Sequence, residues 1–335
     1  MNRLFRWDQM GLFLLALAAG ILPFAVPEVC AAALREGLTL CSGPLLLSLF
    51  PFLVVSRLLI QCPESDLLAL PFRLAAWGIG IRTPCAARVL CIGFLGGFAP
   101  AASAAAQAVR TGQLTAEEAD ALLPACICSG PSFVVLTVGQ SLLGSAELGV
   151  LLFASQITAN YLTAALLNRF AGMHSVKLGS AAPASPAPPR LDEILADAAI
   201  TYCKLCGFIL FFRMLAAGAG ALLPAGAGTL CSILLEVCSG CDLASRTGRW
   251  GSLLCCAALS VQGLSVLLQV RTICPPEMTL RPLYRARMLH LPLSLALFYL
   301  LLPGGEADVF STLPARILLM RRVPPDCALL VFAVC

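Results

Sequence analysis

An apolar segment with a break at its centre sets the strongest constraint on how this 335-residue chain can fold. Residues 122–143 are apolar enough to enter a bilayer, but Ser129-Gly130-Pro131-Ser132 interrupts them. Proline lacks an N–H donor and disfavours helix in the residue before it, so nearby backbone groups lose their helical partners. Lipid cannot bind those groups, so such a break is stable only where protein or water surrounds it. The segment therefore predicts a discontinuous helix of the kind that forms solute sites in transporters.

A weaker copy of this pattern follows in the second half of the chain. The apolar residues 253–270 carry Ser260, Gln262, Gly263 and Ser265 at the matching point. Two interrupted segments at corresponding positions of two halves indicate a transport site. The alternative is a pair of kinked structural helices whose small residues lie at packing interfaces.

The composition predicts an all-α polytopic membrane protein in a lipid bilayer. Hydrophobic residues make up 59% of the chain, charged residues only 12%, and the mean hydropathy is +0.90. Soluble domains carry roughly a quarter charged residues. The net charge of +4 is spread through loops without a basic patch, so we expect no nucleic-acid partner. Residues 1–27 resemble a signal peptide, but further apolar spans follow at once, which favours an uncleaved first transmembrane helix.

The 17 cysteines do not form a convincing metal or redox motif. Two Cys-x-x-Cys pairs occur, Cys203 with Cys206 and Cys238 with Cys241, and both lie in or beside apolar segments. A zinc site needs four convergent ligands, and neither histidine lies near these pairs in sequence. We therefore expect free thiols that pack as small hydrophobes, with no metal and no cofactor.

The chain divides into two repeats flanked by shorter segments. A transmembrane helix and loop are expected over 1–37, a first repeat over 38–170, and a linker rich in proline, alanine and serine over 171–191. The second repeat covers 192–303, and the tail 304–335 has no predicted structure.

Two local sequence patterns predict individual helices within these regions. Thr115 followed by Glu117 and Glu118 predicts a capped helix start, with the acids in the first turn. Residues 66–77 predict a short amphipathic helix at the membrane interface, with a plain connecting helix as the alternative.

Polar and glycine residues inside apolar spans are candidates for a site. Gly97 lies in a glycine- and proline-containing stretch where the backbone can approach a ligand closely, and Asn160 should face the protein interior. Glu236 is the sharpest candidate, because an unpaired carboxylate in an apolar segment is costly. Its alternative role is a structural ion pair with Arg246 or Arg249.

The distribution of arginine and lysine predicts the topology. The positive-inside rule is satisfied if 122–143 enters from the outside and returns as a re-entrant hairpin, which leaves the linker in the cytoplasm. For the second half, the same rule is satisfied if 253–270 enters from the cytoplasm and returns. The halves then form inverted repeats, each consisting of a span, a broken span, a re-entrant hairpin and a span.

Several spaced motifs resemble one family. The chain, over roughly 38–300, resembles the sporulation integral membrane proteins with nucleoside-recognition (Gate) domains, which are distantly similar to concentrative nucleoside transporters. The motifs that carry this resemblance are Gly93 to Ala102, Ser129-Gly130-Pro131-Ser132-Phe133, Leu235-Glu236 with Ser239-Gly240, and Gln262-Gly263-Leu264-Ser265 through Gln269. The chain departs from the family pattern at Gly97-Phe98-Ala99-Pro100-Ala101-Ala102, where a tyrosine and a glycine are missing.

The resemblance implies a substrate site formed by both halves. Together with the polar residues of the spans, the expected site consists of Gly97, Ser129, Gly130, Ser132, Asn160, Glu236, Ser239, Gly240, Gln262, Gly263, Ser265 and Gln269. Helices that begin after Gly130 and Gly263 would direct free N–H groups at the cavity, which favours a carboxylate without a buried cation. A nucleoside would use the same groups, so dipicolinate and nucleosides both remain candidate substrates.

These observations predict a transporter of a small polar or anionic organic solute that works by alternating access in a multi-pass bacterial cell membrane, with a forespore membrane and a homo-oligomer as further expectations. The alternative is a non-transporting membrane assembly protein required for spore envelope formation. An enzyme is not expected, since no motif supplies a nucleophile with an activating base.

Overall fold

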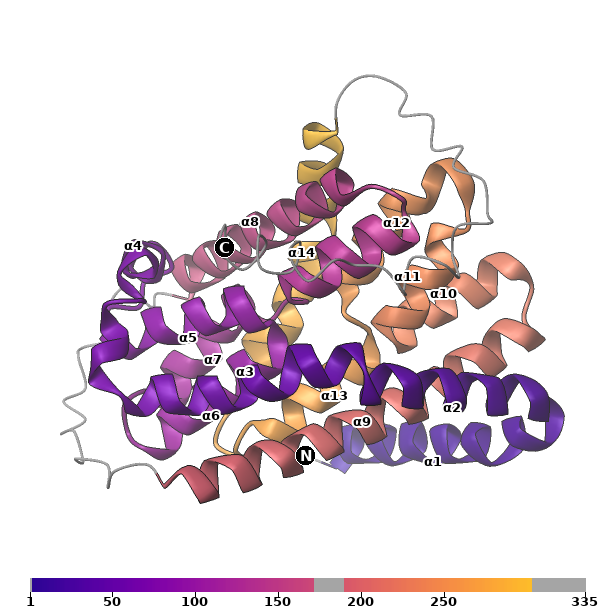
Figure 1. Ribbon diagram of the computed structural model, residues 1–335, viewed down its shortest axis with the longest axis horizontal. Helices are drawn as coiled ribbons and strands as arrows, with labels where there is room; N and C mark the ends of the chain where they lie inside the picture. The colour runs from indigo at the N-terminus through magenta and orange to yellow at the C-terminus, as the bar shows by residue number, and fades with distance from the viewer. Residues whose placement is uncertain (1, 172–189, 303–335) are drawn as a thin grey trace.

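The computed structural model describes residues 2–171 and 190–302, and every regular element in these ranges is helical (Figure 1). The all-α expectation is therefore confirmed for this part of the chain. Most of the linker expected over 171–191 and the whole tail expected over 304–335 lie outside the described residues.

The N-terminal region consists of three helices. The loop that we expected after the first helix, within 1–37, is absent, because a second helix begins at Pro27. The helices are α1 (Asn2–Ala25), α2 (Pro27–Ser42) and α3 (Pro44–Gln61). Proline suits the first turn of a helix, where its missing N–H costs nothing, which explains why α2 begins at once. Cys30, Ala33, Gly37 and Cys41 form its buried face, and this face packs along α9.

A short connection follows α3. It contains a 3-10 turn, η1 (Pro63–Asp66), and the helix α4 (Leu70–Gly78). The helix expected over 66–77 is thus present, and it exposes Leu70, Leu74 and Trp77. Such an apolar outer face suits contact with lipid.

The rest of the described chain forms two halves, and the second opens with an additional long helix, α9. The first half contains α5 (Pro84–Gly96), α6 (Phe98–Arg110), α7 (Ala116–Cys126), the π-helix η2 (Ser132–Leu142) and α8 (Ala146–Phe170). The second contains α9 (Leu191–Leu222), α10 (Ala225–Leu235), α11 (Val237–Ser245), η4 (Gly248–Trp250), α12 (Gly251–Val261), α13 (Gly263–Ile273) and α14 (Arg281–Leu301). In the first half, and in the second half after α9, two pairs of short helices precede one long helix.

The first pair of each half folds back on itself. α5 packs against α6 around the single residue Gly97, and α10 packs against α11 around Glu236. Small residues permit this close approach: a Cβ on Gly93 would lie 3.2 Å from the Cβ of Ala101, and one on Gly240 would lie 2.8 Å from the Cα of Ile233. We call these pairs the first hairpin (α5–α6) and the second hairpin (α10–α11).

The second pair of each half runs on without folding back, which corrects the expected hairpins over 122–143 and 253–270. α7 does not pack along η2, and α12 does not pack along α13. Residues 248–273 are together long and apolar enough to form one membrane span with a break at Gln262. The physical reason is that a glycine on an inner face of each first pair, Gly93 facing Ala101 and Gly240 facing Ile233, allows close antiparallel packing there, so the hairpin lies one pair of helices earlier in each half.

The two halves interlock in a reciprocal way. α6 of the first half packs on α13 of the second, and α11 of the second packs on η2 of the first. Similarly, α14 contacts α7 and α12 contacts α8. One shared core cluster of buried apolar side chains therefore extends through both halves.

Asp120 of α7 links the two halves through hydrogen bonds to the segment before α14. Its carboxylate accepts hydrogen bonds from the backbone N–H of Thr279 at 2.8 Å, from the hydroxyl of Thr279 at 2.6 Å, and from the N–H of Leu280 at 3.1 Å. α7 itself begins as expected, since the hydroxyl of Thr115 accepts from the N–H of Glu118 at 3.1 Å and the Glu118 carboxylate accepts from the Thr115 N–H at 3.0 Å.

The two hairpins open at opposite ends of α9. The end of α6 shares a cavity with Asp197 and Lys204 in the first part of α9, whereas the second hairpin begins at Ala225, three residues after α9 ends at Leu222. The stretch from Lys204 to Leu222 corresponds to about 27 Å at ~1.5 Å per helical residue. This separation is close to the ~30 Å hydrocarbon thickness of a bilayer.

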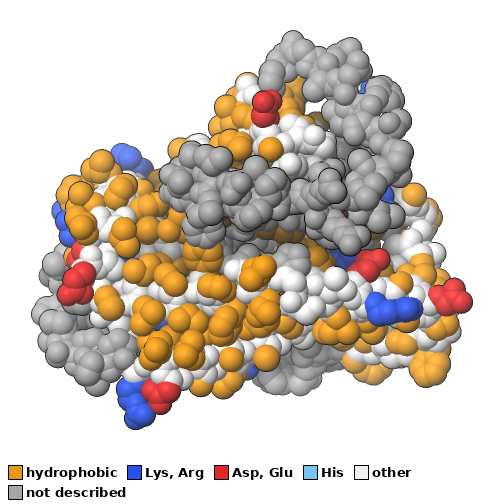
Figure 2. Space-filling view, in the orientation of Figure 1, with side chains coloured by type: hydrophobic (Ala, Val, Ile, Leu, Met, Phe, Trp, Pro, Cys, Tyr) orange, Lys and Arg blue, Asp and Glu red, His pale blue; other side chains and the backbone are white. Residues whose placement is uncertain are grey.

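Within the described ranges, four helical stretches are long and apolar enough to cross a membrane: 27–47, 146–170, 191–222 and 248–273. Their outer faces expose large apolar side chains such as Phe170, Leu162 and Leu222. Figure 2 shows hydrophobic side chains over much of the face formed by α3, with few charged ones among them. An extensive apolar exterior of this kind is consistent with a membrane protein.

Candidate functional site at the crossing of interrupted helices

The tip of the first hairpin rests on the break that follows α7. Gly97 has a φ of +79°, in the region that side chains disfavour, and a Cβ there would lie 2.6 Å from the backbone N of Gly130. Residues 127–130 are not helical, so the backbone of this break is open to contact. Only a glycine at the tip allows the two backbones to meet.

The second half repeats this arrangement. Gly263 follows the break between α12 and α13, has a φ of +70°, and would place a Cβ 3.0 Å from the backbone N of Glu236. Glu236 is the single residue at the tip of the second hairpin. Gln262, which forms this break, is itself in the left-handed region with a φ of 67°.

A side-chain contact joins the two breaks to each other. The Nε2 atom of Gln262 donates to the hydroxyl of Ser129 at 3.5 Å and to the carbonyl of Leu259 at 2.8 Å. Both Gln262 and Ser129 are buried. The four interruptions, at Gly97, 127–130, Glu236 and Gln262, thus meet at one buried place, which we call the central crossing.

A buried arginine binds both breaks. Arg287 of α14 donates to the carbonyl of Ile127 at 2.9 Å, to the Asn160 side-chain oxygen at 3.3 Å, and to the carbonyl of Ser260 at 3.4 Å. Ile127 and Ser260 lie at the C-terminal ends of α7 and α12, where the helix dipoles place partial negative charge. Asn160 also donates to Ile127 at 3.5 Å, so α8 holds the same carbonyl.

Arg287 has no carboxylate partner in the part of the chain that the structure describes. Its side chain is only 8% exposed, and its Nε atom lacks a hydrogen-bond partner among these residues. A buried charge without a counter-ion is costly, and in membrane proteins such residues mark solute pathways. Arg287 is therefore the strongest candidate for recognition of an anion.

Glu236 has a local structural role that sequence reasoning did not assign. Its two carboxylate oxygens accept from the backbone N–H groups of Cys238 at 2.8 Å and Ser239 at 2.7 Å, which caps the start of α11. Neither expected partner binds it, since Arg246 pairs with Asp242 and Arg249 lies over the ring of Trp250. The carboxylate thus occupies the start of α11, one of the helix starts at the crossing that would otherwise attract an anion.

The other expected site residues lie on the helices that meet at the crossing. Ser132 and Ser239 stand in the first turns of η2 and α11. Gly240 lies inside the second hairpin, where it permits close packing. Ser265 and Gln269 form a buried pair on α13, with the amide of Gln269 donating to the Ser265 hydroxyl at 2.9 Å. The oxygens of Gln262 and Gln269 have no hydrogen-bond partner among the described residues.

The chemistry of the crossing favours a ligand that accepts hydrogen bonds. α6, η2 and α13 all begin there, so their first N–H groups and the positive ends of their dipoles point toward it. Arg287 adds a fixed positive charge with five donors. A small carboxylate-bearing solute matches this donor set better than a cation does.

Arg287 was absent from the predicted site, where the expectation was carboxylate binding without a buried cation. In the sequence it lies among the arginines at positions 271, 281 and 285, which together resemble a cytoplasmic loop. The signal that distinguishes it is helical spacing: Leu283, Ala286, Arg287, His290 and Ser294 form the buried face of α14.

The Cys-x-x-Cys pairs lie on single helix faces, one pair on α9 and the other on α11. No group of three or more potential metal ligands occurs within residues 2–171 and 190–302. No protein-family model, curated protein or solved structure matches the chain.

Proposed function

We propose that this protein is a membrane transporter for a small polar or anionic organic solute, and that it binds the solute at the central crossing. The observation that carries the proposal is the convergence of four interrupted helix pairs at one buried place, where Arg287, which has no carboxylate partner among the described residues, binds two of the breaks. Interrupted helices at the interface of two repeats form solute sites in transporters.

The positions of the two hairpins support alternating access. They open at opposite ends of α9 while their tips meet the same crossing. In a bilayer, the first hairpin would enter from the linker side and the second from the other side, as inverted repeats with re-entrant hairpins require. Movement of either hairpin would then open the crossing to one side of the membrane.

Among candidate solutes we favour a carboxylate over a neutral nucleoside. Glu236 already occupies the start of α11, and the three remaining helix starts together with Arg287 leave a donor-rich site for another carboxylate. Dipicolinate carries two such groups, so it fits this proposal. Membership of the Gate-domain family and a forespore location stay predictions.

The direct test is solute uptake into liposomes that contain the purified full-length protein. Dipicolinate uptake should exceed uridine uptake and should fall at least about tenfold in Arg287→Gln, the effect of losing one charge-assisted contact. Arg285→Gln, an exposed arginine on the same helix, is the control and should transport normally.

Equal uptake by the wild type and Arg287→Gln would argue against this site. If neither dipicolinate nor uridine is transported or raises the melting temperature, and other envelope proteins co-purify with the chain, the alternative of a non-transporting assembly protein would be supported instead.

A further inference from the structure

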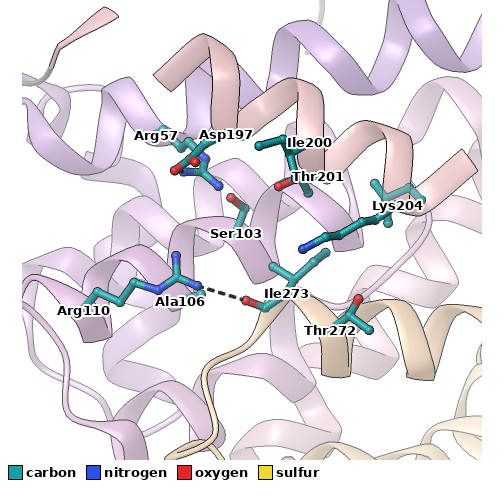
Figure 3. A pocket seen from close by; sticks show the side chains of 11 residues that line it. Arg57, Ser103, Ala106, Arg110, Asp197, Ile200, Thr201, Lys204, Thr272 and Ile273 are labelled. Atoms are coloured by element: carbon teal, nitrogen blue, oxygen red, sulfur yellow. Dashed lines mark hydrogen bonds and ion pairs between the residues drawn. The ribbon is translucent and has the colours of Figure 1, made fainter. Parts of the chain in front are cut away.

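A second site lies away from the central crossing, in a cavity of about 150 Å³ near the start of α9. Figure 3 shows its lining side chains, which come from α3, α6, α9 and α13. α6 and α13 run from the crossing, at Gly97 and Gly263, to this cavity at Ala106 and Thr272. On α13 the nine helical residues span about 13 Å at ~1.5 Å each, and on α6 the lining residue nearest the crossing, Ser103, is six residues or about 9 Å from Gly97, so the two sites are separate.

The lining of the cavity is predominantly basic. It includes three cations, Arg57, Arg110 and Lys204, but only one carboxylate, that of Asp197. In Figure 3 the charged ends of Arg57 and Lys204 and the hydroxyl of Ser103 point into the same space. Two positive charges therefore remain without a carboxylate from the lining.

Arg57 is the buried cation of this site. It is only 8% exposed, and its Nη1 atom pairs with Asp197 at 2.5 Å. The carboxylate partner is itself largely exposed, and the Nε atom of Arg57 has no partner among the described residues. A buried guanidinium with unused donors is suited to a tetrahedral oxyanion, which can accept several hydrogen bonds at once.

The hydroxyl of Ser103 gives a second, independent indication. Ser103 is 2% exposed, and its oxygen has no hydrogen-bond partner among the residues that the structure describes. It lies on α6 one turn before Ala106, facing the cavity (Figure 3). Buried polar atoms are normally satisfied, so an unpaired one that lines a cavity indicates a ligand or solvent.

The cavity also lies near one end of a helix that is longer than the hydrocarbon core of a bilayer is thick. α9 has 32 residues, about 48 Å at ~1.5 Å per residue, whereas the hydrocarbon core is ~30 Å thick. The additional length, with Asp192, Glu193 and Asp197, is at the N-terminal end, where the cavity is. Basic pockets between helices at this depth bind the head groups of anionic lipids.

We infer that this cavity binds a phosphate group through Arg57, Arg110, Lys204 and Ser103. The phosphate comes from an anionic lipid head group or from a soluble phosphate, and both sources present the same oxyanion to these donors. The site is independent of the solute site at the central crossing.

Binding to the full-length protein in neutral detergent tests this inference. The probes are dioctanoyl phosphatidylglycerol, dioctanoylglycerol, which lacks the phosphate, and inorganic phosphate against potassium chloride of equal ionic strength. We expect phosphatidylglycerol to bind at least about tenfold more tightly than dioctanoylglycerol.

The pocket variant is Arg110→Gln with Lys204→Gln, two exposed positions whose replacement should leave the fold intact. The matched control is Arg35→Gln with Arg82→Gln, which removes the same charge from exposed positions outside the cavity. The pocket variant should lose at least about tenfold in affinity, and the control should stay within about threefold.

For a third variant we expect the opposite change, an increase in affinity for phosphate. Asp197→Asn removes the carboxylate that competes for Arg57, so phosphate-bearing probes should bind it more tightly. Unchanged or weaker binding would overturn the role of Arg57.

The probes also identify the source of the phosphate. Tight binding of phosphatidylglycerol alone supports a lipid head group, and equally tight binding of inorganic phosphate supports a soluble ligand. The inference is overturned if the pocket variant binds like the control, or if the phosphate-bearing probes bind no more tightly than dioctanoylglycerol and chloride.

Discussion

The two halves form the same crossing of hairpin tip and broken helix, but they do so with different chemistry. In the first half the tip is the bare Gly97 and the break is four residues long, from 127 to 130. In the second half the tip is Glu236, whose carboxylate caps α11, and the break is the single residue Gln262. The first half therefore offers free backbone donors, whereas the second half satisfies part of its own.

This difference predicts that the two hairpins have different roles. A capped tip and a short break give a rigid element, because fewer backbone groups depend on an external partner. A glycine tip on a wide break leaves N–H groups available for a ligand. We expect the first hairpin to respond to the solute and the second to support it.

The largest expected effect distinguishes the two glycines at the crossing. Gly97→Ala should cost about 3 kcal/mol, since left-handed backbone strain adds to an overlap with the Gly130 backbone. Gly263→Ala should cost about 2 kcal/mol, because its nearest backbone atoms are farther away, at 3.0 Å instead of 2.6 Å. Thermal unfolding in detergent measures both.

Gly207→Ala is the control for these two variants. A Cβ at this exposed helical position meets nothing within 4 Å, so stability should not fall. Equal effects at Gly97 and Gly263 would mean that the first crossing is no tighter than the second.

The next effect concerns the cap that only the second hairpin has. Glu236→Ala should destabilise the protein by about 2 kcal/mol, because it leaves the N–H groups of Cys238 and Ser239 unpaired, and Glu236→Gln should recover about half of this. The free energy of unfolding of each variant is compared with that of Glu147→Ala, an exposed acid in the first turn of α8. A loss no larger than that of Glu147→Ala would contradict the capping role.

A smaller effect concerns the left-handed residue in the second break. Gln262→Ala loses the hydrogen bond to Leu259 and keeps the unfavourable φ, whereas Gln262→Gly loses the bond but relieves about 1 kcal/mol of strain. We therefore expect the glycine variant to be the more stable of the two by about that amount. Equal melting temperatures would indicate that the φ of Gln262 carries no strain.

The smallest effect lies outside the crossing. Asp242 and Arg246 form an i,i+4 ion pair near the outer end of the second hairpin, and Arg246 is exposed. Asp242→Asn should change the free energy of unfolding by less than about 0.5 kcal/mol, since solvent screens such pairs. A loss as large as that of Glu236→Ala would show that the whole second hairpin, and not only its tip, depends on charge.

Much of the local structure could be predicted from short stretches of sequence. The start of α7 follows from Thr115 and Glu118, which are three residues apart and bind each other. The breaks at 127–130 and at Gln262 follow from glycine and proline in apolar runs. The identity of the hairpins was not predictable in this way, because it depends on whether small residues face each other across two helices.

The candidate site shows the same limit. The pairs Gly97 with Gly130 and Ser129 with Gln262 were expected as members of one site, and the structure brings each pair together. Arg287 was not expected, since its partners Ile127 and Asn160 are more than 120 residues away in sequence. Nothing in its neighbours distinguishes it from the exposed Arg285 except its position on the buried face of α14.

The sequence by itself determined the helical class, the apolar exterior and the places where helices must break, because proline, glycine and apolar periodicity act through bonds that are local to the chain. The tertiary structure decided which pairs fold back, which breaks meet, and that a buried arginine joins them. These features depend on long-range contacts between backbones, where a single Cβ or one carbonyl in reach determines whether two segments can meet.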